Sequence, residues 1–273
     1  MNNLQDALPS TSKSTSQIYT FKRPYPQRFS LPFDVIKYMI KNCKSAKVWK
    51  KLITSCKFFY PKYPILPVKR LDVYSKMKCF ADGEIFNASK SFPKLWVYDV
   101  LVAGFVTNIS VVILNVFKFD LRALNMPAQS LTFDEYKHLT SSGSIKEIYL
   151  ESCAIKNADG TIVTADKLVE NLKLLERFEM CRFNPLIFQS GTMKKMVQHL
   201  NECRKFWLFR FLEIQETFDF ASLVDFLLKN KTVTVILAYR GPISDAYKEN
   251  VANVLKEIKK DSSLKYPCIK FDA

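Results

Sequence analysis

From about residue 92 onwards, apolar residues follow two alternating spacings, one typical of short strands and one typical of amphipathic helices. The clearest strand pattern is IKEIYLESCAI at 145–155. Weaker versions of this pattern begin at Phe92, Ile109, Leu175, Cys203 and Asn230. The four starts from residue 145 onwards are separated by 30, 28 and 27 residues, so the strands are predicted at a near-constant interval.

Helical patterns fill these intervals, and each begins at a residue that favours a helix N-cap. They cover 164–175, 192–203, 219–229 and 244–260, with Thr164, Thr192, Asp219 and Ser244 as the predicted caps. Residues 265–271 are expected to form a closing strand. Regular alternation of strand and helix predicts an α/β fold with a parallel sheet.

A repeat template helps to distinguish a solenoid from an ordinary α/β domain, which are the two possible forms of this fold. The leucine-rich-repeat pattern L-x-x-L-x-L-x-x-N/C-x-L is filled at every position by 145–155, with Cys153 at the Asn/Cys position. That position turns inward after the strand, so its side chain must bond to nearby backbone or pack as a small group. Cys153 and the interval favour a leucine-rich-repeat-like strand–helix solenoid over 92–273, and an ordinary parallel-sheet α/β domain is the alternative.

The first part of the chain has a different pattern. Residues 1–28 are rich in Ser, Thr and Pro and are expected to form a disordered tail. A short helical module is predicted over 29–68, with Ser30 and Ser45 as the caps of two helices and no clear third helix. Residues 69–91 are expected to be a connector. Because two short helices cannot be stable alone, this module must dock on the chain or on a partner.

Charge is concentrated in the same N-terminal part. The chain has a net charge of +15, and residues 1–80 hold sixteen basic and three acidic side chains. This segment is therefore expected to attract an acidic surface. Seven cysteines without a C-x-x-C pair, and no signal peptide, predict reduced thiols in a cytoplasmic or nuclear protein.

One segment raises the question of a membrane. Residues 100–117 contain no charged side chain and are marginally long enough to span a bilayer. Four polar residues interrupt the segment, and it is rich in β-branched residues. Two buried strands with a turn around Asn108 therefore explain it at least as well, and membrane association is not expected.

Motifs for catalysis or cofactor binding are not found. The sequence contains no P-loop, H-E-x-x-H, G-x-S-x-G or G-x-G-x-x-G pattern. His199 has Cys203 four residues later, but two ligands do not make a zinc site. We therefore expect neither catalytic residues nor a metal or cofactor.

Residues 31–66 resemble an F-box. They begin with Leu31-Pro32, followed by Asp34 and an aliphatic pair at 35–36, and the second helix ends near Cys56-Lys57 with two aromatic residues after it. Segments 131–150 and 157–178 are similar to the repeat region of the large nematode family of F-box-like proteins with divergent repeats.

The resemblance implies a non-enzymatic role as a substrate-recognition subunit of an SCF-type cullin–RING ubiquitin ligase. It implies that the F-box helices bind a Skp-type adaptor, and through it a cullin, while the C-terminal region selects a protein substrate. The implied adaptor contacts are Leu31, Pro32, Val35, Ile36, Met39 and Leu52. The module departs from the family pattern because it is short and unusually lysine-rich, although the known adaptors are acidic.

Outward-pointing residues of the predicted strands are the candidates for substrate contact. Those expected to point outward are Glu147, Tyr149, Glu151, Glu179, Arg182, Trp207, Phe209 and Arg210. Among them, the predicted substrate-binding residues are Tyr149, Glu151, Arg182, Trp207, Phe209 and Arg210, because Trp, Tyr and Arg often anchor interfaces. For Trp207 and Phe209, a position in the core is an equal alternative.

Two other functions fit the same sequence. One is a basic nucleic-acid-binding protein, in which phosphates contact the N-terminal lysines near Trp49 and Phe58. The lysines concerned are Lys37, Lys41, Lys44, Lys47, Lys50, Lys51 and Lys57. No nucleic-acid-binding motif or clear recognition helix supports it. The other is a repeat scaffold with no ligase role.

Overall fold

The computed structural model describes residues 31–74, 78–87, 94–104, 109–261, 263 and 265–271. It divides the chain into two compact units, unit 1 (Met1–Asn42) and unit 2 (Cys43–Ala273). The predicted tail at 1–28, the predicted cap Ser30 and the strand start Phe92 lie outside the described residues.

Unit 1 contains one described helix, α1 (Phe33–Asn42). It begins directly after Pro32, whose carbonyl accepts hydrogen bonds from the N–H groups of Val35 and Ile36 at 3.1 and 3.2 Å. Proline favours such a position because it has no N–H to leave unsatisfied. Asp34 in the first turn and Lys41 in the last turn complement the helix dipole.

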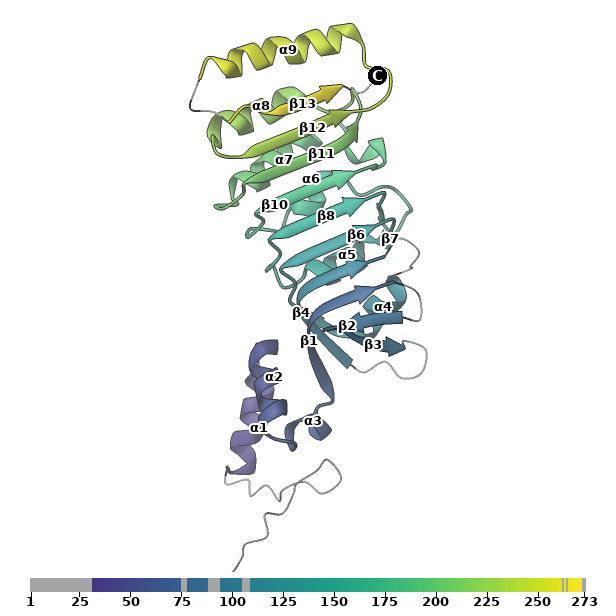
Figure 1. Cartoon of the computed structure of the whole chain (residues 1–273), viewed down its shortest axis with the longest axis vertical. Coiled ribbons are helices and arrows are strands. Elements are labelled where there is room, and N and C mark those ends of the chain that lie inside the picture. Colours follow the sequence, from purple (N-terminus) through teal and green to yellow (C-terminus); the bar gives the residue numbers. More distant parts are fainter. Residues whose placement is uncertain are drawn as a thin grey trace, which may run out of the picture. The chain divides into compact units, whose positions relative to one another are not determined.

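Unit 2 contains the other described helices and all of the described strands (Figure 1). Its helices are α2 (Ala46–Ser55), α3 (Phe59–Lys62), α4 (Ser110–Asn115), α5 (Phe133–Thr140), α6 (Ala165–Val169), α7 (Thr192–Asn201), α8 (Phe220–Lys229) and α9 (Asp245–Lys259), with a 3-10 turn η1 at Pro185–Ile187. Its strands are β1 (Ile65–Val73), β2 (Lys78–Ala81), β3 (Glu84–Asn87), β4 (Lys94–Ala103), β5 (Val116–Phe119), β6 (Ala123–Pro127), β7 (Ser130–Thr132), β8 (Glu147–Glu151), β9 (Ala154–Lys156), β10 (Arg177–Cys181), β11 (Leu208–Ile214), β12 (Thr234–Tyr239) and β13 (Cys268–Phe271).

Most of these strands form one open, mostly parallel sheet of eleven strands. From β1 the order is β4, β6, β8, β10, β11, β12 and β13, and each strand is parallel to the next. β5 also pairs with β4, and β2 and β3 form an antiparallel hairpin beside β1. The predicted α/β fold with a parallel sheet is confirmed, and β13 is the closing strand expected at 265–271.

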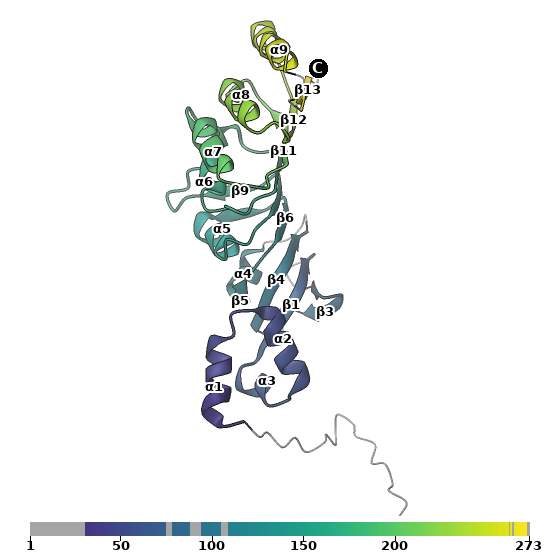
Figure 2. The same ribbon diagram turned by 90° about the vertical axis from the view of Figure 1, so that its left-hand side faces the viewer.

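Helices α4 to α9 lie on one face of this sheet (Figure 2). The strands direct alternate apolar residues to that face, for example Ile148 and Leu150 of β8, which belong to the buried core. None of these six helices lies on the opposite face (Figure 2), and the residues of that face are mostly half-buried. We call it the open face.

Equivalent positions recur along the sheet. Ala123, Glu147, Arg177, Leu208 and Thr234 lie at the same level on successive strands, at intervals of 24, 30, 31 and 26 residues. Ala128, Ser152 and Arg182, which directly follow β6, β8 and β10, share a left-handed backbone with φ of 51–52°. The same local geometry is therefore built three times from different side chains.

Several local predictions are confirmed. Asp219 and Ser244 cap α8 and α9 by accepting hydrogen bonds from the N–H groups of Ser222 and Tyr247. The Cys153 thiol donates to the carbonyl oxygen of Met126 at 2.7 Å, which is one of the two roles that the sequence predicted for this side chain.

Other helix boundaries differ from the prediction. α7 begins at Thr192 itself, with Gly191 as its N-cap in a left-handed conformation. α6 ends at Val169 instead of continuing to residue 175. The residues that follow α6 form hydrogen-bonded turns, in which the N–H groups of Leu172 and Leu175 donate to Val169 and Leu172 carbonyls.

Other predicted elements are wrong. A short third helix, α3, follows α2, although no clear third helix was expected there. The strand expected from Ile109 is instead helix α4, with Val112 and Ile113 buried, followed by β5. The expected turn at Asn108 lies outside the described residues. The predicted connector, 69–91, contains most of β1 and all of β2 and β3, so the sheet begins before residue 92. Among the described residues, no helix has the length and apolar character needed to cross a bilayer.

Asp82 connects the β2–β3 turn with β1 and α2. It lies in the β2–β3 turn, and its carboxylate accepts hydrogen bonds from the backbone N–H groups of Lys69 and Arg70 at 2.8 and 2.9 Å. The same carboxylate pairs with Lys50 Nζ of α2 at 2.9 Å. Burial opposes ionisation, but these hydrogen bonds outweigh it and hold the pKa of Asp82 below its ordinary value of 3.8.

We expect Asp82→Asn to lower the free energy of unfolding by about 1 kcal/mol at pH 7, because it removes the charge that these donors contact at a partly exposed site. Asn tolerates the left-handed backbone (φ 52°) at this position. Since the folded pKa is depressed, the contribution is complete above about pH 5 and is lost as the pH falls through 3.8 and below. Urea unfolding of the wild type and of Asp82→Asn at pH 7 and pH 3 measures the contribution of Asp82 to the free energy of unfolding. Asp134→Asn, at an exposed pair with Lys137, is the control, and an equal loss there would contradict the assignment.

Candidate functional site

Unit 1 presents an apolar surface to solvent. Four large apolar side chains in and just before α1 are exposed, and we call them the α1 ridge: Leu31, Phe33, Val35 and Tyr38. Val35 and Tyr38 are three residues apart, so they lie on the same side of the helix. A cluster of exposed apolar side chains on a ten-residue helix is typical of a surface that another molecule covers.

The residues that the F-box resemblance implies as adaptor contacts are not equally accessible. Pro32 is exposed together with Leu31 and Val35 of the ridge, and Met39 is half-buried. Ile36 is only 4% exposed, so its side chain is not available to a partner in this structure. Leu52 belongs to unit 2, where it lies half-buried on α2.

The N-terminal aromatic residues have structural contacts within unit 2. Trp49 is buried, and its indole N–H donates to the carbonyl oxygen of Ile65 at 2.8 Å. Phe58 is half-buried and carries the ammonium group of Lys62 over its ring. The Trp49 ring is therefore not available for stacking on a nucleic-acid base.

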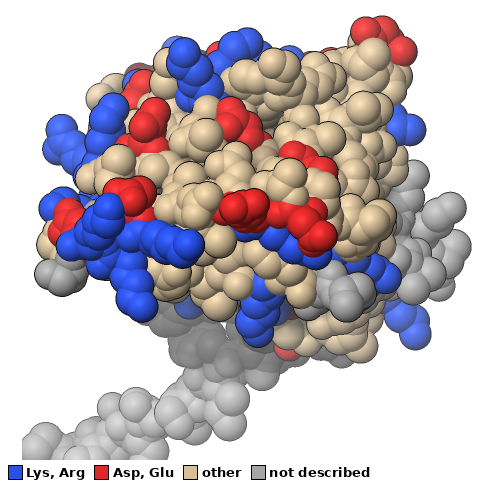
Figure 3. Space-filling view, turned by 90° about the horizontal axis from the view of Figure 1, so that it is seen from above, with Lys and Arg blue, Asp and Glu red and all other residues tan. Residues whose placement is uncertain are grey.

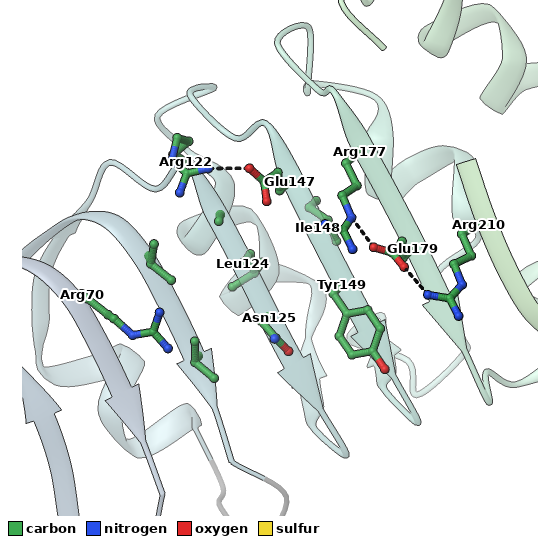
Figure 4. Close-up of a pocket in the computed structure, with 13 residues that line it drawn as sticks. Arg70, Arg122, Leu124, Asn125, Glu147, Ile148, Tyr149, Arg177, Glu179 and Arg210 are labelled. Carbon is green, nitrogen blue, oxygen red and sulfur yellow. Dashed lines mark hydrogen bonds and ion pairs between the residues drawn. The ribbon is translucent and has the colours of Figure 1, made fainter. Parts of the chain in front are cut away.

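The open face of unit 2 contains a hollow of about 460 Å³ (Figure 4). Its floor is formed by short side chains of β4 and β6, namely Val100, Val102, Ala123 and Asn125. Longer side chains of the neighbouring strands border it, with Arg70 on the β1 side and Tyr149 and Glu147 on the β8 side. The hollow exists because two strands with small outward residues lie between strands with large ones.

A buried carboxylate holds two arginines beside this hollow. Glu179 of β10 is only 2% exposed, and it accepts hydrogen bonds from Arg177 Nε and, at 3.1 Å, from an Nη atom of Arg210 on β11. Both arginine side chains are 40% exposed. Buried charges are normally paired and hydrogen-bonded, and Glu179 satisfies that requirement through these two guanidinium groups. We call these three residues the arginine triad.

A second ion cluster lies around Arg122, which directly precedes β6 and also lines the hollow. Arg122 bonds Asp99 at 2.7 Å and Glu147 at 2.5 Å, which raises the pKa of the guanidinium. Here two carboxylates face one guanidinium, whereas in the triad one carboxylate faces two. The two clusters therefore carry opposite excess charge.

A third row of charges follows the carboxyl ends of the strands. Arg182 bonds Glu151 and Glu213, and Glu213 also accepts a hydrogen bond from Arg240. Burial, and then the hydrogen bond to Glu151, raises the pKa of the Tyr149 hydroxyl to about 12, so Tyr149 stays a hydrogen-bond donor at neutral pH.

The predicted substrate-binding residues are only partly brought together. Tyr149 and Arg210 line the hollow, while Glu151 and Arg182 belong to the row at the carboxyl ends. Trp207 is 48% exposed but precedes β11 and is not part of the hollow's lining. The prediction for Phe209 is wrong, because its side chain is fully buried in the core.

Sequence reasoning missed several residues of the hollow. They are Arg70, Arg122, Asn125 and Arg177. Arg177 had a usable signal, since it lies two residues before Glu179 on one strand and so must share its face. Arg70 had none, because it lies in the predicted connector.

No family model matches this chain, and neither a curated protein nor a solved structure matches it. Function must therefore be inferred from the α1 ridge and the hollow. Within the described ranges, no three His, Cys, Asp or Glu side chains are grouped to hold a metal ion. His138 packs edge-on against Phe119, which is a structural contact.

Proposed function

We propose that this protein is a non-enzymatic interaction protein that serves as a substrate-recognition subunit of an SCF-type cullin–RING ubiquitin ligase. In this role the α1 ridge binds a Skp-type adaptor and the open face of unit 2 binds the protein substrate. The α1 ridge carries the proposal, because its four apolar side chains are exposed in and just before a short helix, and the segment begins with the Leu31-Pro32 pair typical of an F-box.

We propose further that residues 92–273, the part of unit 2 from β4 onwards, form a leucine-rich-repeat-like solenoid. Three features support this assignment. The strands of the large sheet follow chain order from β4 to β13, with β5 off this path and β7 and β9 in a separate two-stranded sheet. Equivalent positions recur at 24 to 31 residues, and Cys153 bonds the backbone of the preceding strand of the sheet. Sequential strands of one repeat array suit a binding surface spread over many strands, because each repeat contributes a few side chains to it.

A nucleic-acid-binding role has less support. Trp49 is buried and Lys50 is paired with Asp82, which removes two of the residues on which it depends. On the end of unit 2 seen in Figure 3, acidic side chains are interspersed with basic ones, and no single sign covers that surface. Electrostatic binding of nucleic acid favours a continuous basic surface.

The adaptor interaction is tested with the full chain and a purified Skp-type adaptor. We expect Leu31→Ala/Val35→Ala to weaken adaptor binding at least about tenfold, because burying an apolar side chain of this size contributes roughly 1.5–3 kcal/mol. Leu114→Ala is the matched control, since Leu114 is also an exposed apolar residue but lies on α4. Calorimetric titration measures the dissociation constants.

Two results would remove the ligase role. One is that neither wild type nor variant binds the adaptor. The other is equal binding by both, which would show that the α1 ridge is not the contact. A different result would support the nucleic-acid role: an affinity for DNA or RNA that falls steeply with added salt and is the same in wild type, Leu31→Ala/Val35→Ala and Leu114→Ala.

A further inference from the structure

We propose that the hollow on the open face recognises an acidic segment of a protein partner, with a carboxylate of that segment bound by Arg177 and Arg210. This deepens the proposed function by naming the chemistry of the substrate, and it rests on that function in taking the open face as the substrate surface. Figure 4 shows both arginines directed toward Glu179 at the side of the hollow formed by β10 and β11.

The charge balance of the arginine triad supports an anionic ligand. One carboxylate is shared by two guanidinium groups, so the triad carries an excess of one positive charge. Each guanidinium has five N–H donors, and within the described part of the chain each of these two pairs with a single carboxylate. Arg210 Nε is buried there without a hydrogen-bond partner. That buried atom is not accessible to a ligand, but Nη groups of both arginines remain for a second carboxylate, because both side chains are 40% exposed.

The triad is also prepared for binding before a ligand arrives. Glu179 is buried beneath the open face and fixes both arginine side chains through hydrogen bonds. An arginine held in place loses less conformational entropy when it binds than a free surface lysine does. The planar guanidinium also matches the two oxygens of a carboxylate, which makes such contacts directional.

The excess positive charge is local, which fixes where the acidic group lies. Arg70 is balanced by Asp72, and Arg122 faces two carboxylates. Of these groups of charges, only the arginine triad has more positive than negative charges. The acidic group of the partner therefore belongs over β10 and β11, and apolar or small groups belong over the Val100 and Ala123 floor.

The sheet itself determines how the partner binds. β4, β6 and β8 are hydrogen-bonded to neighbouring strands on both sides, so a partner cannot add a strand at the hollow. The partner must therefore be recognised by side chains of the open face. β1 and β8 are three strand spacings apart, about 14 Å, which accommodates one helix or one extended segment.

The test selects binders from a random 12-residue peptide library on the full chain and then measures affinity by fluorescence anisotropy. We expect selected peptides to be enriched in Asp and Glu. We expect Arg177→Gln and Arg210→Gln each to weaken the best peptide about tenfold or more, because each loses a charge-assisted hydrogen bond. Arg204→Gln, at an exposed arginine outside the hollow's lining, is the matched control and should change affinity less than about twofold.

The proposal is overturned if the library yields no binders, if the binders lack acidic residues, or if Arg204→Gln weakens binding as much as the triad variants. Circular dichroism shows whether each variant is folded. If a triad variant unfolds, the wild-type chain decides: its affinity for the acidic peptide must fall as NaCl rises from 50 to 500 mM, and an unchanged affinity overturns the proposal.

Two further controls distinguish this proposal from a nucleic-acid ligand and from the proposed adaptor interaction. A single-stranded oligonucleotide that displaces the peptide and also loses affinity in Arg177→Gln would identify a nucleic acid as the ligand and overturn the peptide assignment. Leu31→Ala/Val35→Ala should still bind the acidic peptide, because the α1 ridge lies in unit 1. Failure of adaptor binding and failure of peptide binding are thus distinguishable.

Discussion

Replacement of Phe211 by alanine is expected to lower the free energy of unfolding of unit 2 by about 3–5 kcal/mol. Phe211 points from β11 into the core and is fully buried. Its ring centroid lies 4.3 Å from that of Phe209 and 5.2 Å from that of Phe188, and further aromatic contacts join it to Phe178, Phe183 and Phe218. Alanine would leave a cavity where five aromatic rings now converge.

Urea unfolding followed by circular dichroism measures this loss. Phe117→Ala is the matched control, because Phe117 lies on β5 with 51% of its surface exposed, and we expect a loss below about 1 kcal/mol there. A Phe211→Ala variant that is as stable as the control would contradict the position of β11 in the sheet. The size of the difference therefore tests the fold as well as the packing.

The same strand shows how far the sequence predicts the fold. In LFRFLEI, the existence of a strand followed from the apolar spacing, and it is confirmed as β11. Adjacent residues of a strand point to opposite faces, so Phe209 and Arg210 cannot both be outward. The structure directs Arg210 to the open face and Phe209 to the core, and strict use of the alternation would have excluded Phe209 from the predicted substrate-binding residues.

The segment after Ile109 shows where local preference fails. Val111, Val112 and Ile113 are β-branched and predict a strand, yet they form part of helix α4. Burial explains the outcome, because the helix places Val112 and Ile113 in the core while Val111 and Leu114 stay exposed. Tertiary packing of this kind is not visible in a single sequence.

Arg70 shows why part of the hollow was missed. The register of β1 shifts between Val68 and Arg70, so Lys69 and Arg70 are exposed in succession and the alternation is interrupted. A pattern search therefore treats these residues as a connector. Placement of Arg70 opposite Val100 depends on pairing between β1 and β4, which begin 29 residues apart in the chain.

Glu179→Leu is expected to lower the free energy of unfolding by about 2–3 kcal/mol. Removing one partner of a buried ion pair typically costs 3–5 kcal/mol, and the value is smaller here because both guanidinium groups are partly in water. Glu147→Leu is the control, since Glu147 also pairs with an arginine but its side chain is 40% exposed, and we expect a loss below about 1 kcal/mol. Equal losses for the two variants would show that burial of Glu179 does not matter.

A triple variant then separates stability from binding. Arg177→Met/Glu179→Leu/Arg210→Met removes all three charges together, and we expect its free energy of unfolding to return to within about 1 kcal/mol of wild type, because apolar side chains often replace a buried ion network without loss. The same variant should no longer bind the acidic peptide. If it remains as unstable as Glu179→Leu, the arginine triad is needed for folding. If it is stable and still binds, another part of the open face holds the ligand.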